Sequence, residues 1–246
     1  MLDLHEATSP EVGEAVSKGA VAVLAVGAQE QHGAHLPLST DTVMAQGVAR
    51  RIAEAIGGLL LPPIAYGDAW NNEGFPGTLS LSPDTMRAIF MDIGRGLSRS
   101  GFRALVIVNG HFGNREPIAL AARLLKQETG FPVFHLDYPG MEQAATDICD
   151  SKPAAPTFYH ADEVETSMML ALAPHLVRMD KAAAEYPTFP ATFGMEAISL
   201  STFNKSGVFG DPTSSTAAKG EALIARIVDE SVKLVELFLS REHKKL

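Results

Sequence analysis

Two uninterrupted apolar runs, both rich in valine, place the strongest limit on how this chain can fold. One run, "AVAVLAVGA", occupies residues 20–28, and the other lies within "FRALVIVNGHFGN" at residues 102–114. A strand with one face in water alternates apolar and polar residues, and neither run shows such alternation. Both therefore predict strands that other parts of the chain cover on both faces.

Helical segments separate these strands from further strand-like segments. Helices are predicted at residues 40–58, 82–101 and 115–130, and additional strands at residues 58–67 and 131–137. Ser82 is the expected N-cap of the second helix, because a serine hydroxyl can accept a hydrogen bond from a free N–H of the first turn. Strands that alternate with helices of this length predict a mostly parallel sheet with right-handed crossovers. Ligand sites in such sheets lie beyond the carboxyl ends of the strands.

The second half of the chain is less regular. Residues 139–160 carry prolines at positions 139, 153 and 156, and they are predicted to form an irregular segment that is mobile or faces a neighbouring subunit. Helical patterns resume at residues 162–174 and at residues 213–246, the second of which is long and amphipathic. No internal repeat or clear linker divides the chain, so residues 1–246 are predicted to form a single domain.

Charge and composition disfavour several classes of function. A formal net charge of -9 argues against a nucleic-acid-binding protein and gives no reason to expect an anionic membrane as a partner. The single cysteine, Cys149, cannot form an internal disulfide. The N-terminal segment "MLDLHEATSPEVGEA" carries acidic residues and no apolar signal core, and no later run approaches the length of a membrane span. A covalent serine or cysteine mechanism has no support, because GxSxG and paired CxxC motifs are missing. We expect a compact protein of the size of an enzyme, with the cytoplasm as its default location.

Metal-capable residues follow the first apolar run immediately, in "GAQEQHGAHLPLSTDT". Glu30 and His32 are two positions apart, so in an extended segment both side chains point to the same side and could hold one metal ion. Asp41, at the head of the next helix, could reach the same point, where free N–H groups favour a carboxylate. The alternative is an ordinary loop with a solvated His32 and a capping Asp41. His35 is expected to point away from the others because its spacing from His32 is odd.

His111 comes three residues after the second apolar strand, in "ALVIVNGHFGN". Because parallel strands deliver their carboxyl ends to one edge of a sheet, His111 is expected beside Glu30 and His32. Gly110 and Gly113 allow the backbone to turn tightly or to approach a ligand closely. The alternative is a turn histidine that bonds a carbonyl group.

A third polar cluster, made of His160, Asp162, Glu163 and Glu165, stands at the start of the helix predicted at residues 162–174. Acidic residues in a first helical turn often only complement the helix dipole, so at least two of the three are expected to be structural. The cluster is also the obvious source of one more carboxylate for a second metal ion. His160 is the candidate for proton transfer, because it adjoins these carboxylates without belonging to the predicted ligand set. A packing role for His160 is the alternative.

Five segments of the chain carry a known pattern: "GAQEQHGAHLPLSTDT", "FPGTLSLS", "VNGHFGN", "HADEVETS" and "GVFGDPTSSTAAKG". In these segments, which follow one another in the family's order, the chain resembles the creatininase family, also called creatinine amidohydrolase-like proteins. The resemblance implies a three-layer α/β/α sandwich with a mostly parallel central sheet. It also implies two divalent metal ions, zinc and/or manganese, and a homo-oligomer, for which the creatininase homohexamer is the precedent.

The resemblance assigns metal binding to four matching positions, with Asp41 bridging the two ions: Glu30, His32, Asp41 and His111. The remaining ligand is less direct. Creatininase has a glutamate two positions after the matching histidine, where this chain has Gly113. The pattern seen in many relatives points instead to the "HADEVETS" segment, where it favours Glu165 over Glu163.

Two further departures concern the substrate. Creatininase uses tryptophans near its active site, whereas this chain has only Trp70, and Asn72 stands where many relatives have a histidine. Creatinine itself is therefore not the expected substrate. Specificity is expected to reside in the segments at residues 66–76 and 139–160.

The resemblance implies a metal-dependent hydrolase in which water activated by two metal ions cleaves a small amide, expected to be cyclic, or a related C–N bond. His160 would donate a proton to the leaving nitrogen. Two alternatives keep the metal site and change the bond: a formamide deformylase, and a ring-opening hydrolase of a carbohydrate-derived cyclic ketone. A non-catalytic metal-binding scaffold is the third alternative, and a closed coordination shell would favour it.

Overall fold

A parallel sheet forms the centre of the molecule, as the apolar runs predict. Over residues 2–243, the part of the chain that this computed structural model describes, five parallel strands pair in the order β1-β3-β2-β4-β5. Their bounds are β1 (Leu2–Asp3), β2 (Val21–Val26), β3 (Leu59–Leu60), β4 (Ala104–Asn109) and β5 (Val133–Leu136). The two apolar runs became the neighbouring strands β2 and β4, and their register places Val26 opposite Asn109.

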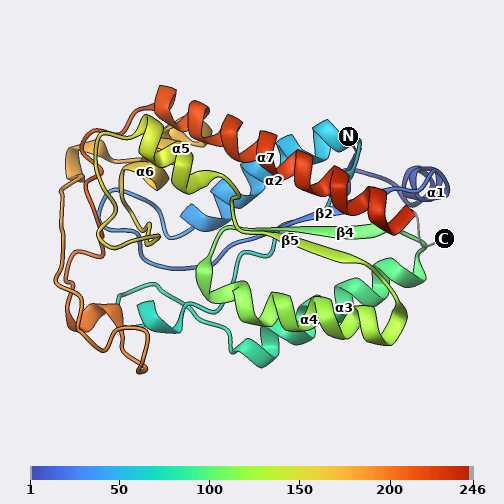
Figure 1. Cartoon of the computed structure of the whole chain (residues 1–246), viewed down its shortest axis with the longest axis horizontal. Helices are drawn as coiled ribbons and strands as arrows, with labels where there is room; N and C mark the ends of the chain where they lie inside the picture. The colour runs from blue at the N-terminus through green and yellow to red at the C-terminus, as the bar shows by residue number, and fades with distance from the viewer. Residues whose placement is uncertain (1, 244–246) are drawn as a thin grey trace.

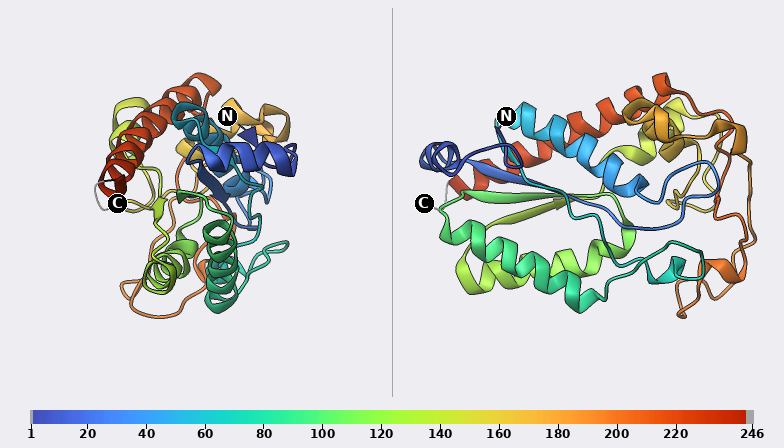
Figure 2. Two further views of the ribbon diagram at one scale, coloured as in Figure 1. Left: turned by 90° about the vertical axis from the view of Figure 1, so that its right-hand side faces the viewer. Right: turned by 180° about the vertical axis from the view of Figure 1, so that it is seen from behind.

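Helices cover both faces of the sheet and produce three layers (Figure 1). One face carries α2 (Thr40–Ile56), α5 (Met141–Ile148), α6 (Glu163–Leu172) and α7 (Ala217–His243), and the other carries α3 (Pro83–Arg99) and α4 (Arg115–Thr129). Helix α1 (Ser9–Ser17) lies at the end of the molecule where both termini are found (Figure 2). Short 3-10 helices lie in the loops: η1 (Trp70–Asn72), η2 (Phe112–Asn114), η3 (Pro174–Leu176), η4 (Met179–Lys181) and η5 (Leu200–Thr202). None of the described helices is long and apolar enough to cross a membrane.

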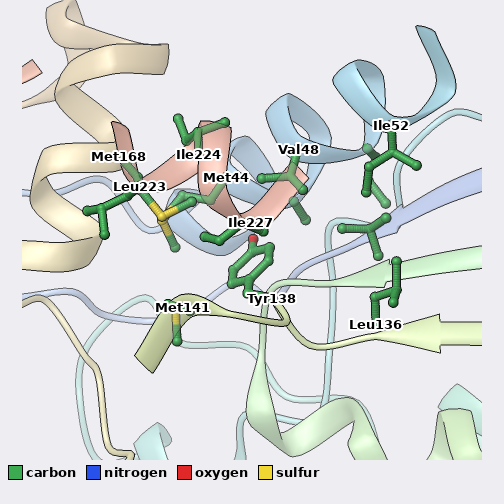
Figure 3. Packing of buried hydrophobic residues seen from close by; sticks show 14 of the residues in the cluster. Met44, Val48, Ile52, Leu136, Tyr138, Met141, Met168, Leu223, Ile224 and Ile227 are labelled. Carbon is green, nitrogen blue, oxygen red and sulfur yellow. The ribbon is translucent and has the colours of Figure 1, made fainter. Parts of the chain in front are cut away.

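Alternate residues of β2 divide the hydrophobic core into two halves. Val21, Val23 and Ala25 face the half that contains α2 and α7, whereas Ala22, Leu24 and Val26 face the half that contains α3 and α4. Figure 3 shows the first half, in which Met44 and Val48 of α2 lie near Ile224 and Ile227 of α7. Every residue of β2 is buried, which confirms that the strand is covered on both faces. Each large apolar side chain buried in this way contributes about 1.5–3 kcal/mol.

Most helix boundaries lie within a few residues of their predicted positions. Ser82 caps α3 as expected, because its hydroxyl accepts a hydrogen bond from the Thr85 amide at 3.2 Å. Helix α2 ends at Gly57, whose left-handed backbone (φ 65°) is the usual conformation after a helix. The C-terminal helix begins at Ala217 rather than at residue 213. Residues 244–246, at its predicted end, lie outside the described residues.

The strand predicted at residues 58–67 is much shorter than expected. Leu59 and Leu60 form β3, and Ile64 adds a single isolated bridge to Val26. The prolines at positions 62 and 63 interrupt the pairing, because proline has no N–H group to donate to a neighbouring strand.

The prediction that residues 139–160 are irregular is wrong for its first third. Residues Met141–Ile148 form α5, and Gly140 precedes this helix in a left-handed conformation (φ 82°). Met141, Ala144 and Ala145 are buried at a helical spacing on the face that carries α7. This short apolar stripe, rather than the flanking prolines, determines the local structure.

The position of α6 depends on close contact with α7. Gly220 of α7 faces the backbone carbonyl of Ser167 in α6 so closely that a β-carbon on Gly220 would overlap with it. Met168 of α6 and Leu223 of α7 belong to the same buried cluster. Because α6 starts within the third polar cluster, the contact with α7 also determines where the side chains of that cluster lie.

We therefore expect Gly220→Ala to destabilise the fold by about 1–3 kcal/mol, since the new methyl group forces α6 and α7 apart. Gly96→Ala in α3 is the matched control. No atom lies within 4 Å of its added β-carbon, so it should be neutral or stabilise by about 0.5–1 kcal/mol. Urea unfolding midpoints measure both effects. Equal effects of the two substitutions would contradict the proposed helix contact.

Candidate metal centre

Five acidic and histidine side chains converge beyond the carboxyl ends of β2 and β4. Glu30 and His32 follow β2, His111 follows β4, Asp41 lies in the first turn of α2, and Glu165 lies in the first turn of α6. All five are buried. The structure thus brings together the five residues that the sequence nominated as metal ligands.

Asp41 lies at the middle of this cluster. Its Oδ1 is 3.1 Å from His32 Nε2, and its Oδ2 is 3.2 Å from His111 Nδ1. Glu30 Oε1 approaches His111 Nδ1 to 3.1 Å, and Glu165 Oε2 approaches His32 Nε2 to 3.5 Å. Asp41 belongs to two groups of three potential ligands. Within each group the ligand atoms all lie within 4.8 Å of one another. One group is Glu30, Asp41 and His111, and the other is His32, Asp41 and Glu165.

The two histidines of these groups are oriented as metal-binding histidines usually are. The Nδ1 atom of His32 lies 3.2 Å from the carbonyl oxygen of Glu30, and the Nε2 atom of His111 lies 2.8 Å from the carbonyl oxygen of Asp68. A carbonyl oxygen can only accept, so each of these nitrogens carries a hydrogen. The opposite nitrogens face the carboxylates and would donate a lone pair to a metal ion that displaces their protons.

The charges of the cluster fit a cation. Glu30, Asp41 and Glu165 place three carboxyl groups in the interior, and no Lys or Arg between residues 2 and 243 forms an ion pair with any of them. His32 Nε2 and Asp41 Oδ2 are buried and lie 3.1 and 3.2 Å from atoms of opposite charge, but neither makes a hydrogen bond within the same described range. Buried carboxylates and polar atoms without hydrogen bonds are costly unless they are compensated. Divalent cations would compensate both, so the residues present suit a metal centre.

The same charges shift the pKa values of the cluster. Burial disfavours the charged ring of His32, but the carboxylates of Asp41, Glu165 and Glu30 outweigh burial and raise its pKa to about 10. The pKa of His111 is likewise raised against the effect of burial, mainly by Glu30 and Asp41. Burial raises the pKa of Glu165 to about 8, although His32 opposes this rise. A metal ion that binds here therefore competes with protons for these side chains.

The structure separates Glu165 from Glu163. The Oε2 atom of Glu165 accepts a hydrogen bond of 2.6 Å from the amide of Ala161, whose left-handed backbone (φ 51°) directs that N–H toward the cluster. Glu163 points elsewhere and accepts hydrogen bonds from the amides of Asp150 and Ser151 at 3.1 and 2.7 Å. It also pairs with Lys219. Glu163 thus belongs to a structural contact that ties the start of α6 to the start of α7.

His160 lies beside the cluster and is buried. Its Nδ1 atom is 3.7 Å from Glu30 Oε1, and its ring lies 4.4 Å from that of His32, measured between centroids. Burial and the positive charge of His32 lower the pKa of His160 to about 3, which keeps the ring neutral near pH 7. With Glu30 and His32 it forms a third group of potential ligand atoms. His35 lies outside all three groups, and its Nε2 atom pairs with the hydroxyl of Thr166 at 2.9 Å.

A cavity of about 70 Å³ opens onto the cluster. Both segments that were expected to control specificity contribute to its wall, through Asn71 and Asn72 on one side and Phe158 and Tyr159 on the other. Phe112 adds a further aromatic side chain after β4. Trp70 is not part of this wall, and its side chain is about half exposed.

Sequence reasoning missed two polar residues that hold the site together. Gln31 is buried between the two candidate ligands of its own segment, and its amide bonds Asn72 and His160. Asn109, the last residue of β4, bonds both backbone groups of His111, at 2.7 Å to the carbonyl and 3.2 Å to the amide. The only signal for either residue was a polar amide side chain at the end of an apolar strand or between two candidate ligands.

Comparison with known proteins tests the resemblance. The chain matches the creatininase family, described as creatinine amidohydrolase, over residues 5–235. It belongs to that family. The match covers nearly the whole chain and confirms the resemblance that the five sequence segments indicated.

Individual relatives of the creatininase family agree with this assignment. The chain is 35% identical to the mycofactocin precursor peptide peptidase of Mycolicibacterium smegmatis, over 83% of this chain and 79% of that protein. It is 33% identical to the creatinine amidohydrolase of Pseudomonas putida, over 83% of this chain and 84% of that protein. Structures of creatininase with Mn and of a creatininase variant of the Zn–Zn type each superpose with a TM-score of 0.83, at 30% identity, over 96% of this chain and 98% of theirs.

These comparisons confirm the predicted fold class and make the chain a creatininase-family hydrolase. The single domain, the homo-oligomer and the cytoplasmic location stay predictions.

Asp162 offers a test of electrostatics at the edge of this site. Its carboxylate caps α6 by accepting hydrogen bonds from the amides of Val164 and Glu165 at 3.0 and 3.2 Å. Burial raises its pKa from the ordinary 3.8 to about 7, although these hydrogen bonds oppose the rise. The protonated acid is therefore favoured in the folded state. Proton binding by Asp162 therefore contributes its full stabilisation of the folded state below about pH 3.8, and this stabilisation is lost as the pH rises through about 7.

Asp162→Asn keeps a cap oxygen but cannot ionise. We expect its stability relative to the parent protein to increase steadily between about pH 4 and pH 7, the window set by the two pKa values. Asp162→Ala is the control for the cap. It should lower the free energy of unfolding by about 1 kcal/mol at low pH, where the carboxyl group of the parent protein is protonated. Urea midpoints measured across this range report both effects. A constant difference between Asp162→Asn and the parent would contradict the raised pKa.

Proposed function

We propose that this protein is a two-metal hydrolase that cleaves an amide C–N bond. The observation that carries the proposal is the position of Asp41, whose two carboxylate oxygens each face a different histidine. One ion would be held by Glu30, Asp41 and His111, and the other by His32, Asp41 and Glu165. Asp41 would belong to both ions.

The donor set supports zinc or manganese as the metal. Imidazole nitrogens and carboxylate oxygens are common ligands of zinc, and carboxylates also suit manganese. The creatininase structures with Mn and of the Zn–Zn type support the same two metals. The chemistry that such ions supply when bound is activation of a water molecule near neutral pH and stabilisation of negative charge on a carbonyl oxygen.

The side chains of the protein then have separate tasks. Asn72 donates a hydrogen bond of 2.8 Å to Glu30 Oε2 and holds that carboxylate toward the cluster through its other oxygen. His160 is the proposed catalytic residue, because its ring lies beside Glu30, lines the cavity and belongs to neither Asp41 group. It would donate a hydrogen bond or a proton to the substrate. The aromatic wall of the cavity would exclude water from the reacting bond.

A small amide, with its C–N bond in a ring, is the substrate class that we propose first. The cavity of about 70 Å³ supports it, because a buried water needs about 10–15 Å³ by the same measure and a small ring replaces only a few waters. The similarity to a creatinine amidohydrolase supports the same class.

A peptide bond is the second candidate, and a specific feature favours it. A larger hollow of about 460 Å³ adjoins the cavity, and five residues line both: Phe112, Asp137, Tyr138, Met141 and Tyr159. A chain extending from the reacting bond would have room in this hollow. The similarity to a mycofactocin precursor peptide peptidase supports this candidate.

Glu165→Gln should lower the metal content of the protein below that of the parent, because the amide is a poorer ligand than the carboxylate it replaces. Glu163→Gln is the matched control, since it makes the same change two residues away. It should keep the metal and instead lose about 1–3 kcal/mol of stability by weakening the pair with Lys219. Elemental analysis after dialysis, together with urea unfolding, separates the two outcomes. Full metal content in Glu165→Gln would remove it from the ligand set.

The proposed reaction is tested with protein loaded with zinc or manganese. We expect hydrolysis of at least one cyclic amide or short peptide in a panel that also contains formamides and cyclic ketones. A chelator should abolish the activity and either metal should restore it. Activity confined to formamides would favour the deformylase alternative, and activity confined to ketones the ring-opening alternative. Hydrolysis that persists in chelated, metal-free protein would contradict the proposal.

A further inference from the structure

Gln31 has a buried amide that connects two functional side chains. Its Nε2 atom lies 2.8 Å from His160 Nε2 and 3.0 Å from Asn72 Oδ1. Its Oε1 atom accepts a hydrogen bond of 3.0 Å from the amide of Gly33. The residue is 6% exposed, and these three hydrogen bonds engage both polar atoms of its side chain.

The orientation of the Gln31 amide is determined at its oxygen. The backbone amide of Gly33 can only donate, so the Gln31 atom that faces it must be the acceptor Oε1. The NH₂ group of Gln31 is therefore on the side of His160 and Asn72. Exchanging the oxygen and nitrogen positions would set two donors against each other at Gly33.

A second residue requires the same orientation. The Nδ2 atom of Asn72 donates a hydrogen bond of 2.8 Å to Glu30 Oε2. This places Asn72 Oδ1 toward Gln31, which must then donate to it. The network consequently runs in one direction, from Gln31 to Asn72 and from Asn72 to Glu30.

The direction of this network decides which nitrogen of His160 carries its hydrogen. The Nε2 atom faces a donor, so it must hold a lone pair, and a charged ring with hydrogens on both nitrogens would oppose the Gln31 amide. The hydrogen therefore lies on Nδ1, the nitrogen nearest to Glu30 Oε1. In His32 and His111 a backbone carbonyl oxygen instead accepts from the ring nitrogen that faces away from the cluster, which is Nδ1 in His32 and Nε2 in His111.

We propose that Gln31 is a positioning residue that holds His160 as a neutral Nδ1–H donor, directed at the substrate and unable to bind a metal ion. This proposal rests on the proposed function and gives His160 a defined role within it. A neutral imidazole N–H is a weak acid, so its task is to donate a hydrogen bond to the amide carbonyl oxygen as negative charge develops there. Direct protonation of the leaving nitrogen would then require another group.

Neighbouring backbone keeps the Gln31 amide in place. A β-carbon on Gly207 (φ 77°) would overlap with Gln31 Oε1, so the glycine backbone itself packs against the amide. The backbone N–H of Gly207 donates a hydrogen bond of 2.6 Å to Asn204 Oδ1, and the backbone N–H of Gln31 donates one of 3.1 Å to the hydroxyl of Thr78. Gln31 is therefore enclosed by the "GVFGD" segment on one side and by residues 72–78 on the other.

Nitrogen NMR of the histidine rings tests this proposal directly. Protein with ¹⁵N-labelled histidine is loaded with zinc, which is diamagnetic, and long-range ¹H–¹⁵N correlations are recorded at mildly alkaline pH. The His160 ring is assigned by the signals that disappear in His160→Asn. We expect the Nδ1 shift of a protonated nitrogen and the Nε2 shift of an unprotonated one. A protonated Nε2 with an unprotonated Nδ1, or a ring protonated at both nitrogens, overturns the proposal.

Substitution of Gln31 supplies the causal test. Gln31→Glu replaces the NH₂ donor by an acceptor of the same shape, so the hydrogen of His160 should appear on Nε2. Gln127→Glu, at an exposed position on α4, makes the same chemical change and should leave the His160 pattern as in the parent. An unchanged His160 pattern in folded Gln31→Glu would contradict the positioning role. If Gln31→Glu does not fold, Gln31→Met removes the donor without adding charge and should yield a mixture of the two neutral ring forms.

The test of the positioning role of Gln31 can be interpreted whether or not the proposed hydrolase function holds. If the parent protein binds no zinc, the two-metal hydrolase fails, and the ring pattern of the metal-free protein still decides the role of Gln31. If the parent binds zinc and hydrolyses an amide but carries the His160 hydrogen on Nε2, only the positioning role fails.

Discussion

The concentration of three buried carboxyl groups, none of which pairs with a Lys or Arg of residues 2–243, is the constraint on which the rest of this structure depends. Glu30, Asp41 and Glu165 come from three separate elements, and charges so placed repel one another in a medium of low dielectric constant. The fold must hold them together against that repulsion. Histidines and buried amides surround them, which compensates part of the charge and leaves room for cations.

The parallel sheet explains how residues far apart in sequence reach one point. Strands β2 and β4 pair along their whole length, so the segments that follow Val26 and Asn109 leave the sheet side by side. Asp41 enters from the start of α2, where free backbone amides favour a negative charge. Glu165 enters from the start of α6, on the same face of the sheet. Strand ends and helix starts thus supply all five candidate ligands.

Much of the fold and the identity of the candidate ligands could be predicted, because both depend on local patterns. Apolar runs, helix caps and the spacing of Glu30 and His32 are readable within a few residues, and the five family segments added the remaining ligands. The family pattern favoured Glu165 over Glu163 as the remaining ligand, but the spacing of the two residues could not explain this preference. It depends on the conformation of Ala161 and on the partner Lys219, 56 residues away from Glu163.

Long-range polar contacts and weak local patterns account for what sequence reasoning missed. The contacts that Gln31 makes with Asn72 and His160 span 41 and 129 residues, and no local signal indicates either. Helix α5 was missed for a different reason. Its three buried apolar residues form a stripe too short to predict a helix from the sequence, where prolines on either side indicated an irregular segment.

The close contact between Gly220 and Ser167 has a consequence for the order in which this protein matures. A ribosome completes every candidate ligand before it begins α7, because Glu165 precedes Ala217 by about fifty residues of chain. The donors therefore exist on the nascent polypeptide before the helix that sets the place of α6. The proposed metal centre would then reach its final geometry only after α7 has docked against α6.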